Sequence, residues 1–188
     1  MRKIDWRLLA FMSFGLAGQI PPVTPTTEEA RIFKIFTTQV QQYVRLRKEL
    51  EASLPAMKQT TQIAKIAENQ LELGRKLVQA RGNAKQGEIF TSEVAQQFRK
   101  IIGNVFRGPK SQMARQTIRP DEPSVGVVGL HINDLSPDDK PSTTMPPTLL
   151  NRLPPLPTDL AYRIVGHHFV LKDTRAGLIV DLIPNAIP

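Results

Sequence analysis

The sequence predicts a mainly α protein that ends in a small β-meander, an antiparallel helical bundle followed by three short strands. Apolar residues recur at three- and four-residue steps through the first half, prolines crowd the second half, and β-branched runs separated by turn residues fill the end. We therefore divide the chain into a signal peptide (1–17), a helical bundle region (26–107), a proline-rich extended connector (108–159) and a β-meander packed on the body (160–187).

The first residues have the pattern of a secretory signal peptide. Arg2, Lys3 and Arg7 precede a short apolar run, and Gly15 and Ala17 are small residues suited to cleavage. The run of about ten residues is half the length that a membrane-spanning helix needs, and no later run approaches that length. We expect an exported protein, periplasmic or extracellular, with no membrane span after cleavage; an uncleaved amphipathic helix is the alternative.

A first helix is predicted to begin after Thr26, because Thr26 and Glu29 have the spacing of a capping box. Arg47 interrupts the apolar stripe that follows, and Pro55 ends or bends the helix. The stripe is expected to pack within the chain, with oligomerisation through a coiled coil of this first helix as the alternative. Its apolar members are Phe33, Phe36, Val40, Tyr43, Leu50 and Leu54.

Two further amphipathic helices complete the predicted bundle. One runs from Ala56 to about Arg81, and the other begins at the N-cap Thr91 and closes at Gly108. The stripe of the former comprises Ile63, Ile66, Gln70, Leu73, Leu77 and Ala80, widened by Leu71 and Val78; that of the latter comprises Val94, Phe98, Ile101, Ile102, Val105 and Phe106.

The second half of the chain reads as extended structure. Nine prolines between residues 120 and 159 favour polyproline conformation, with one candidate strand at Val125–Ile132. Three strands follow, at Tyr162–Val165, His168–Lys172 and Leu178–Ile183, and Gly166-His167 suits a two-residue hairpin. That turn sets the register: Ile164 faces Phe169, Tyr162 faces Leu171, Val165 meets His168 and Arg163 meets Val170, which leaves one face apolar.

The positive charge belongs to the helical region. Of the net charge of +8, residues 28–110 contribute fifteen basic and eight acidic side chains. A basic face could attract an acidic envelope polymer, anionic lipid or nucleic acid, although no aromatic residues alternate with the cations to stack bases, which makes nucleic acid the less favoured partner. The candidate anion-binding face comprises Arg75, Lys76, Arg81, Lys85, Arg99 and Lys100.

The sequence carries no motif for catalysis, a cofactor or a metal. There is no cysteine, no serine in a Gly-x-Ser-x-Gly turn, no glycine-rich phosphate loop and no His-Glu-x-x-His. We therefore predict no enzyme. The competing hypothesis is a hydrolase or metal-dependent enzyme that uses the C-terminal histidines, with candidate groups at His131, His167, His168, Asp173 and Asp181.

Several strings resemble a family of uncharacterised exported bacterial proteins with a helical body, a proline-rich strap and a C-terminal β-meander. They are Tyr43-Val44, Leu54-Pro55, residues 80–91, residues 144–150, residues 153–157, Tyr162-Arg163-Ile164-Val165-Gly166, Leu171-Lys172-Asp173 and Leu178-Ile179-Val180-Asp181. His168 departs from an acidic residue in the family and Gly177 from asparagine. The resemblance implies export and a shared architecture, and it brings no catalytic residue.

Together these observations predict a non-enzymatic exported protein that acts through a binding surface, with an unknown protein or an anionic envelope polymer as its partner.

Overall fold

A computed structural model of the protein describes residues 25–55, 63–109, 111–117, 129–135 and 145–188. The signal peptide predicted at 1–17 lies outside the described residues. In chain order the elements are α1 (Thr27–Ala52), α2 (Ile63–Ala80), α3 (Ser92–Arg107), α4 (Ser111–Thr117), α5 (Pro147–Leu150), β1 (Leu160–Val165), β2 (His168–Asp173) and β3 (Leu178–Ile183).

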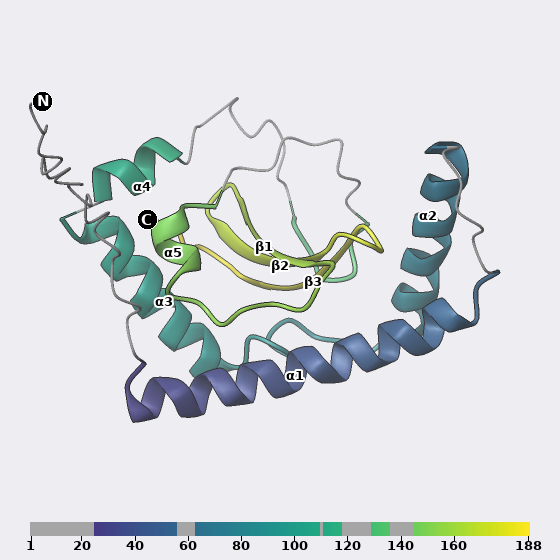
Figure 1. Ribbon diagram of the computed structural model, residues 1–188, viewed down its shortest axis with the longest axis horizontal. Helices are drawn as coiled ribbons and strands as arrows, with labels where there is room; N and C mark the ends of the chain where they lie inside the picture. Colours follow the sequence, from purple (N-terminus) through teal and green to yellow (C-terminus); the bar gives the residue numbers. More distant parts are fainter. Residues whose placement is uncertain (1–24, 56–62, 110, 118–128, 136–144) are drawn as a thin grey trace, which may run out of the picture.

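Helix α1 is the longest element and extends along one side of the whole described body (Figure 1). The predicted capping box is confirmed: the Thr26 hydroxyl accepts from the N–H of Glu29, whose carboxylate accepts from the N–H of Thr26. The helix ends at Ala52, before Pro55. Phe36, Val40 and Tyr43 of its predicted apolar stripe are buried in the core, and the rest of the stripe is partly buried against it. Self-association through that stripe would require it to leave its present packing.

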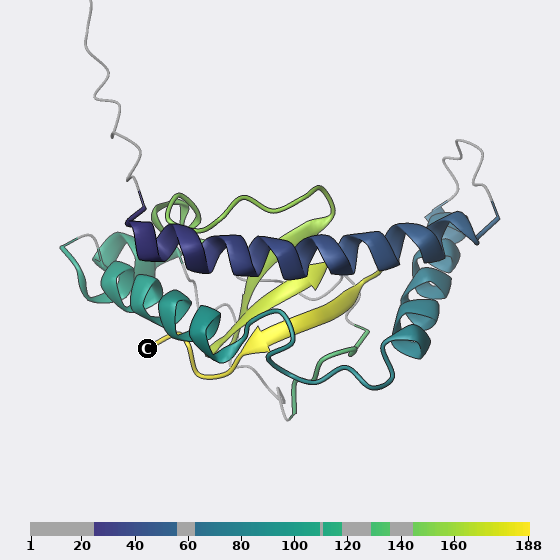
Figure 2. The same cartoon turned by 90° about the horizontal axis from the view of Figure 1, so that it is seen from below.

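The predicted fold class, mainly α with a C-terminal β-meander, is confirmed. Helix α1 packs against both α2 and α3. Helices α3 and α2 lie near opposite ends of α1, and the sheet occupies the space between them (Figures 1 and 2). Helices α1, α2 and α3 each contribute buried side chains to the core cluster that also contains residues of all three strands, so helices and sheet share one core.

The three strands form an antiparallel sheet in the order β1-β2-β3. Its first hairpin has the predicted register, with Ile164 opposite Phe169 and Val165 opposite His168. Gly166 takes the positive φ of 59° that a short hairpin turn needs. The prediction of a single apolar face was too simple, because all six residues of β3 are buried.

The two faces of the sheet bury different clusters. The face toward the helices holds the aromatic cluster, which we define as Phe36, Phe90, Phe98, Tyr162 and Phe169. In this cluster Phe98 lies 5.1 Å from Phe36 and 5.9 Å from Phe169, measured between ring centroids. The opposite face holds a smaller cluster of Val170, Ile179 and Leu182.

Helix α2 uses only part of its predicted stripe. Leu73 and Leu77 are fully buried, whereas Ile66 and Leu71 are 40% and 42% exposed. Between the buried positions, a Cβ on Gly74 would come within 2.8 Å of the Ala176 carbonyl oxygen, so this glycine permits close approach to the β2–β3 turn. The N-terminal part of the predicted helix, 56–62, lies outside the described residues.

The stretch 108–159 is not uniformly extended, which corrects the prediction for it. It contains α4 and the four-residue α5, where Pro147 takes the first helical turn, a position that needs no backbone N–H donor. The candidate strand at Val125–Ile132 lies partly outside the described residues. Just beyond it, Leu135 forms a bridge to Leu178 and Asn133 donates to Ile179, so the chain pairs with the edge of β3.

Candidate functional site

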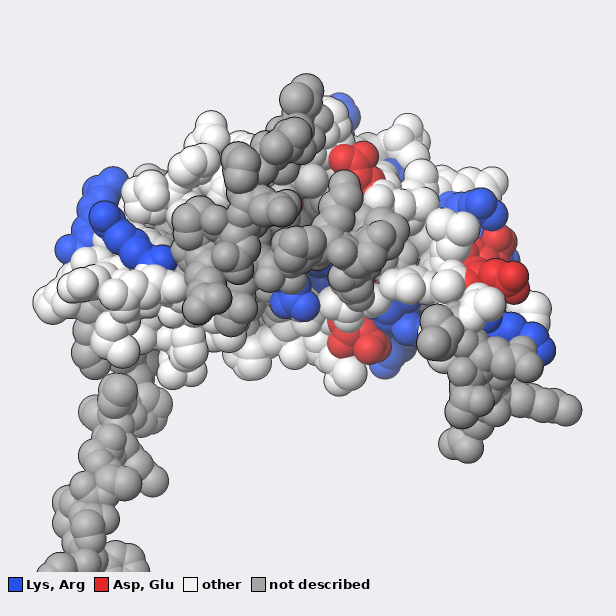
Figure 3. Space-filling model, turned by 90° about the horizontal axis from the view of Figure 1, so that it is seen from above, with Lys and Arg blue, Asp and Glu red and all other residues white. Residues whose placement is uncertain are grey.

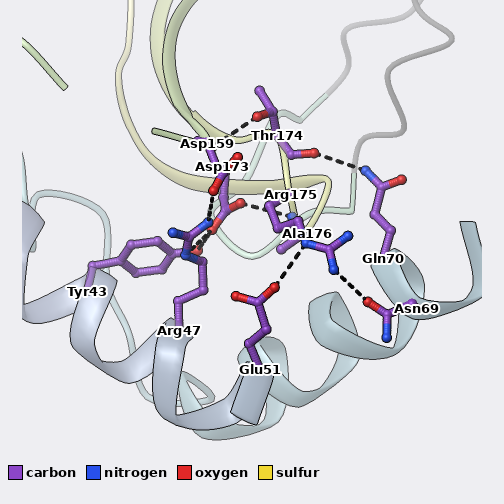
Figure 4. A network of polar contacts seen from close by, with 10 residues as sticks. All are labelled: Tyr43, Arg47, Glu51, Asn69, Gln70, Asp159, Asp173, Thr174, Arg175 and Ala176. Atoms are coloured by element: carbon purple, nitrogen blue, oxygen red, sulfur yellow. Dashed lines mark hydrogen bonds and ion pairs between the residues drawn. The ribbon is translucent and has the colours of Figure 1, made fainter. Parts of the chain in front are cut away.

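A buried polar network connects α1 and α2 to the end of β2 and the turn that follows it (Figure 4). At its centre is the fully buried Asp173. The Tyr43 hydroxyl donates to the Asp173 carboxylate over 2.8 Å, and the Ala176 N–H donates to it over 2.9 Å. Burial raises the pKa of Asp173 above its usual value, while these donors and the Arg47 charge act in the opposite direction.

Arg47 supplies the positive charge of this network. Its side chain is 5% exposed, its Nε lies 3.7 Å from the Asp173 carboxylate, and its Nη1 donates to Asp159 over 3.1 Å. The sequence marked Arg47 only as an interruption of the apolar stripe. Its spacing of four residues from Tyr43 was the available signal, because that spacing places both side chains on one face of a helix.

A second set of bonds anchors the β2–β3 turn. The Arg175 guanidinium donates to Glu51 of α1 over 3.0 Å and to Asn69 of α2 over 2.9 Å, and Gln70 donates to the Thr174 carbonyl (Figure 4). The turn is therefore attached to both helices. Since most of these side-chain groups are paired with one another, this network fixes how the turn attaches to the two helices.

Asp181, on β3, is likewise occupied by the chain itself. Its carboxylate accepts from the N–H groups of Gly87, Ile89 and Phe90 at 2.8–3.0 Å, and from Leu182 next to it. These bonds hold the loop between α2 and α3 against the sheet. The sequence predicted no such role, because the donors lie more than ninety positions away along the chain.

The histidines of the competing enzyme hypothesis have separate partners. His167 Nδ1 lies 3.1 Å from the carbonyl oxygen of Ile187, His168 Nδ1 accepts from the N–H of Asn185, and His131 lies 3.8 Å from Asp134. Within the residues that the structure describes, no three His, Asp or Glu side chains are grouped in a way that could hold a metal ion. The five candidate groups are thus not brought together into one site.

The predicted basic face is divided by the fold. Arg75 and Lys76 belong to α2, whereas Arg99 and Lys100 belong to α3, near the other end of α1 (Figure 1). Lys85 is exposed in the loop between those helices, and Arg81 is 7% exposed. The six residues therefore do not form one continuous face, because the β-meander lies between α2 and α3.

Two members of the predicted face and two further cations are concentrated at one end of the molecule. We call Arg99, Lys100, Arg107 and Arg115, all exposed and on α3 or α4, the cationic end. None of the four lies within 4 Å of a carboxylate in the described parts of the chain, and Glu93, the acidic residue of α3, already pairs with Arg31. In Figure 3 basic atoms gather at the left, over the α3–α4 side, with no acidic atoms beside them.

The comparisons give no relative for this chain: no family model, no curated protein and no solved structure matches it. Among the described residues, no helix has the length and apolar character needed to cross a bilayer.

Proposed function

We propose that this is a non-enzymatic exported protein that binds an acidic polymer of the bacterial envelope through its cationic end. The observation that carries the proposal is the contrast between two sets of charges. Arg47, Asp173 and Asp181, which are buried, are occupied by internal partners, whereas the cationic end lacks close carboxylate partners among the described residues.

The geometry of α3 and α4 supports multivalent binding. Lys100 and Arg107 are seven positions apart, which places them on the same side of α3 two turns from one another. Arg115 of α4 donates to the carbonyl of Phe106, so its guanidinium is held near the C-terminal end of α3. Repeated negative charges on a flexible polymer can contact several of these cations at once, which raises the total affinity above that of one pair.

Export is supported by the leader. Arg2, Lys3 and Arg7 ahead of the apolar run predict recognition by the export machinery, and the resemblance to exported bacterial proteins agrees with it. Mass spectrometry of the N-terminus, on protein recovered from envelope, medium and cytosolic fractions, tests this part. A mature chain that starts near residue 18 outside the cytosol is expected; one that starts at Met1 among cytosolic proteins contradicts export.

Binding is tested with polygalacturonate, an acidic polysaccharide, immobilised on beads. We expect retention of the mature chain at about 50 mM salt and release at about 300 mM, because screening weakens interactions between exposed charges. Neutralising Lys100, Arg107 and Arg115 to glutamine should weaken binding at low salt by roughly tenfold, which is about 1.4 kcal/mol.

The matched control neutralises three exposed cations elsewhere, Arg45→Gln, Lys65→Gln and Arg75→Gln, with the same change in net charge. This triple variant should retain most of the binding. Equal losses in both triple variants would show that net charge alone is responsible and would refute a dedicated surface. Stronger retention on an immobilised envelope protein, insensitive to these substitutions, would favour a protein partner.

A further inference from the structure

A cavity of about 300 Å³ lies between α1 and the segment 80–89. Gln39, Gln42 and Tyr43 line it from α1, and Arg81, Asn83 and Glu88 line it from the opposite wall. Tyr43 and Arg81 are buried, whereas Gln42, Asn83 and Glu88 are exposed. The cavity therefore has buried charged and aromatic groups at its base and polar groups at its rim.

The Arg81 guanidinium is held in a fixed orientation. It donates to the Asn133 side chain over 2.8 Å and to the Val180 carbonyl over 3.0 Å, and its Cζ lies 5.2 Å from the centroid of the Tyr43 ring. Tyr43 is itself held by its bond to Asp173. A guanidinium positioned before a ligand arrives loses little side-chain entropy on binding, which favours affinity.

The negative charge paired with Arg81 comes from an exposed side chain. Glu88 accepts from Arg81 over 3.0 Å, and its side chain is 51% exposed, compared with 6% for Arg81. The Glu88 side chain reaches water, so it can rotate into solvent when another anion takes its place on Arg81. Arg81 cannot, because its other bonds hold it in place.

We propose that this cavity binds a small molecule bearing a carboxylate, which replaces Glu88 on Arg81. When Glu88 leaves, the Nη2 N–H that it accepted can donate to a ligand carboxylate, and a single negative charge restores the neutrality of the Arg81–Glu88 pair. The side-chain amides of Gln39, Gln42 and Asn83 can bond to the polar remainder of the ligand. The volume lies at the lower end of the range for ligand pockets, which limits the ligand to about the size of an amino acid or a dicarboxylic acid.

This site is independent of the cationic end, since it involves other residues on other elements. Among the six basic residues singled out from the sequence, Arg81 is the one that the structure buries, and burial is what gives it this role. Binding of a small carboxylate in the cavity therefore does not depend on binding of a polymer at the cationic end.

Acetate, succinate and L-glutamate, titrated one at a time into the ¹⁵N-labelled mature chain, test the proposal. We expect saturable NMR shifts at the backbone amides of residues 81–89 and at the side-chain amides of the cavity. Glu88→Gln removes the competing carboxylate but preserves side-chain size, so at least one probe should bind this variant roughly threefold to fivefold more tightly. The matched control is Glu72→Gln, an exposed glutamate paired with Arg75 on α2, which should leave the affinity unchanged.

Two further variants define the anchor and the rim. Asn83→Ala, at an exposed position, should weaken binding without altering thermal stability, and Arg81→Gln should abolish it in protein whose NMR spectrum shows a folded chain. Binding confined to Glu88→Gln would still support the site, with Glu88 as a strong competitor. The proposal is overturned if no probe gives saturable shifts in Glu88→Gln, or if inorganic phosphate produces the same shifts with the same affinity in Glu88→Gln and in Glu72→Gln.

Discussion

The two halves of α1 face two kinds of interior. The N-terminal half contributes Phe36 to the aromatic cluster, where five rings pack against one another. The C-terminal half contributes Tyr43 and Arg47 to the polar network, where charged and hydrogen-bonding groups meet at 2.8–3.7 Å. One helix thus joins a region stabilised by apolar burial to a region positioned by directional bonds.

The difference teaches where stability and specificity arise. Burial of a large apolar side chain contributes about 1.5–3 kcal/mol, and rings that pack edge to face add somewhat more. A buried ion pair has a net contribution near zero, since desolvation offsets most of the attraction, although loss of one partner is costly. We therefore expect the aromatic cluster to supply most of the free energy of folding and the polar network to fix where the β2–β3 turn attaches.

The largest effect should come from breaking the aromatic cluster. Phe98 is fully buried and contacts four other rings of the cluster, so Phe98→Ala should lower the free energy of unfolding by about 3–5 kcal/mol. Urea unfolding followed by circular dichroism measures it. Phe33→Ala is the control, because Phe33 is only partly buried and packs at the edge of Phe98. An equal loss in both variants would contradict a central role for the cluster.

A smaller effect should follow from breaking the polar network at Arg47. Arg47→Met retains the length of the side chain but leaves Asp173 buried without its cation, and we expect a loss of about 3 kcal/mol near neutral pH. Adding Asp173→Asn to this variant should recover part of the loss, as the uncompensated charge disappears. Arg45→Met, on the exposed side of α1, is the control. No recovery in the double variant would show that Arg47 acts by packing alone.

The smallest expected effect concerns how the free energy of unfolding depends on pH, which distinguishes the polar network from the aromatic cluster. Because burial raises the pKa of Asp173 in the folded state, protonation of Asp173 stabilises the folded protein fully below the ordinary value of 3.8. That contribution is lost as the pH rises through the folded-state pKa. The free energy of unfolding of the native chain should therefore decrease, relative to Asp173→Asn, as the pH is raised from about 4 towards neutrality.

Glu29 provides a control of opposite sign. The N–H of Thr26 lowers the pKa of Glu29, so its contribution is present above the ordinary value of 4.5 and is lost as the pH falls through the lowered pKa. The native chain should gain stability relative to Glu29→Gln as the pH rises through the lowered pKa to about 4.5, and the difference should change little above that pH. Unfolding curves at several pH values test both slopes, and parallel profiles for native chain and Asp173→Asn would remove Asp173 as the titrating group.

Local sequence patterns predicted correctly those features that depend on residues close together in the chain. The capping box of Thr26, the N-cap Thr91 and the register set by Gly166 all depend on residues within a few positions of each other, and all three are confirmed. Burial was harder to predict. Arg47 and Arg81 were read as an interruption and as part of a surface, because a cation enters the interior only where distant partners meet it.

The sequence by itself determined the three long helices, the N-caps Thr26 and Thr91, the hairpin and the segment of the chain that is rich in positive charge, because each depends on periodicity, backbone preference or composition. Only the tertiary structure decided that the sheet would separate α2 from α3, that Asp181 would hold a loop by its backbone N–H groups, and that Arg81 would line a cavity. These features join residues from distant parts of the chain. Which residues come into contact there depends on tertiary packing, and a local sequence pattern does not predict it.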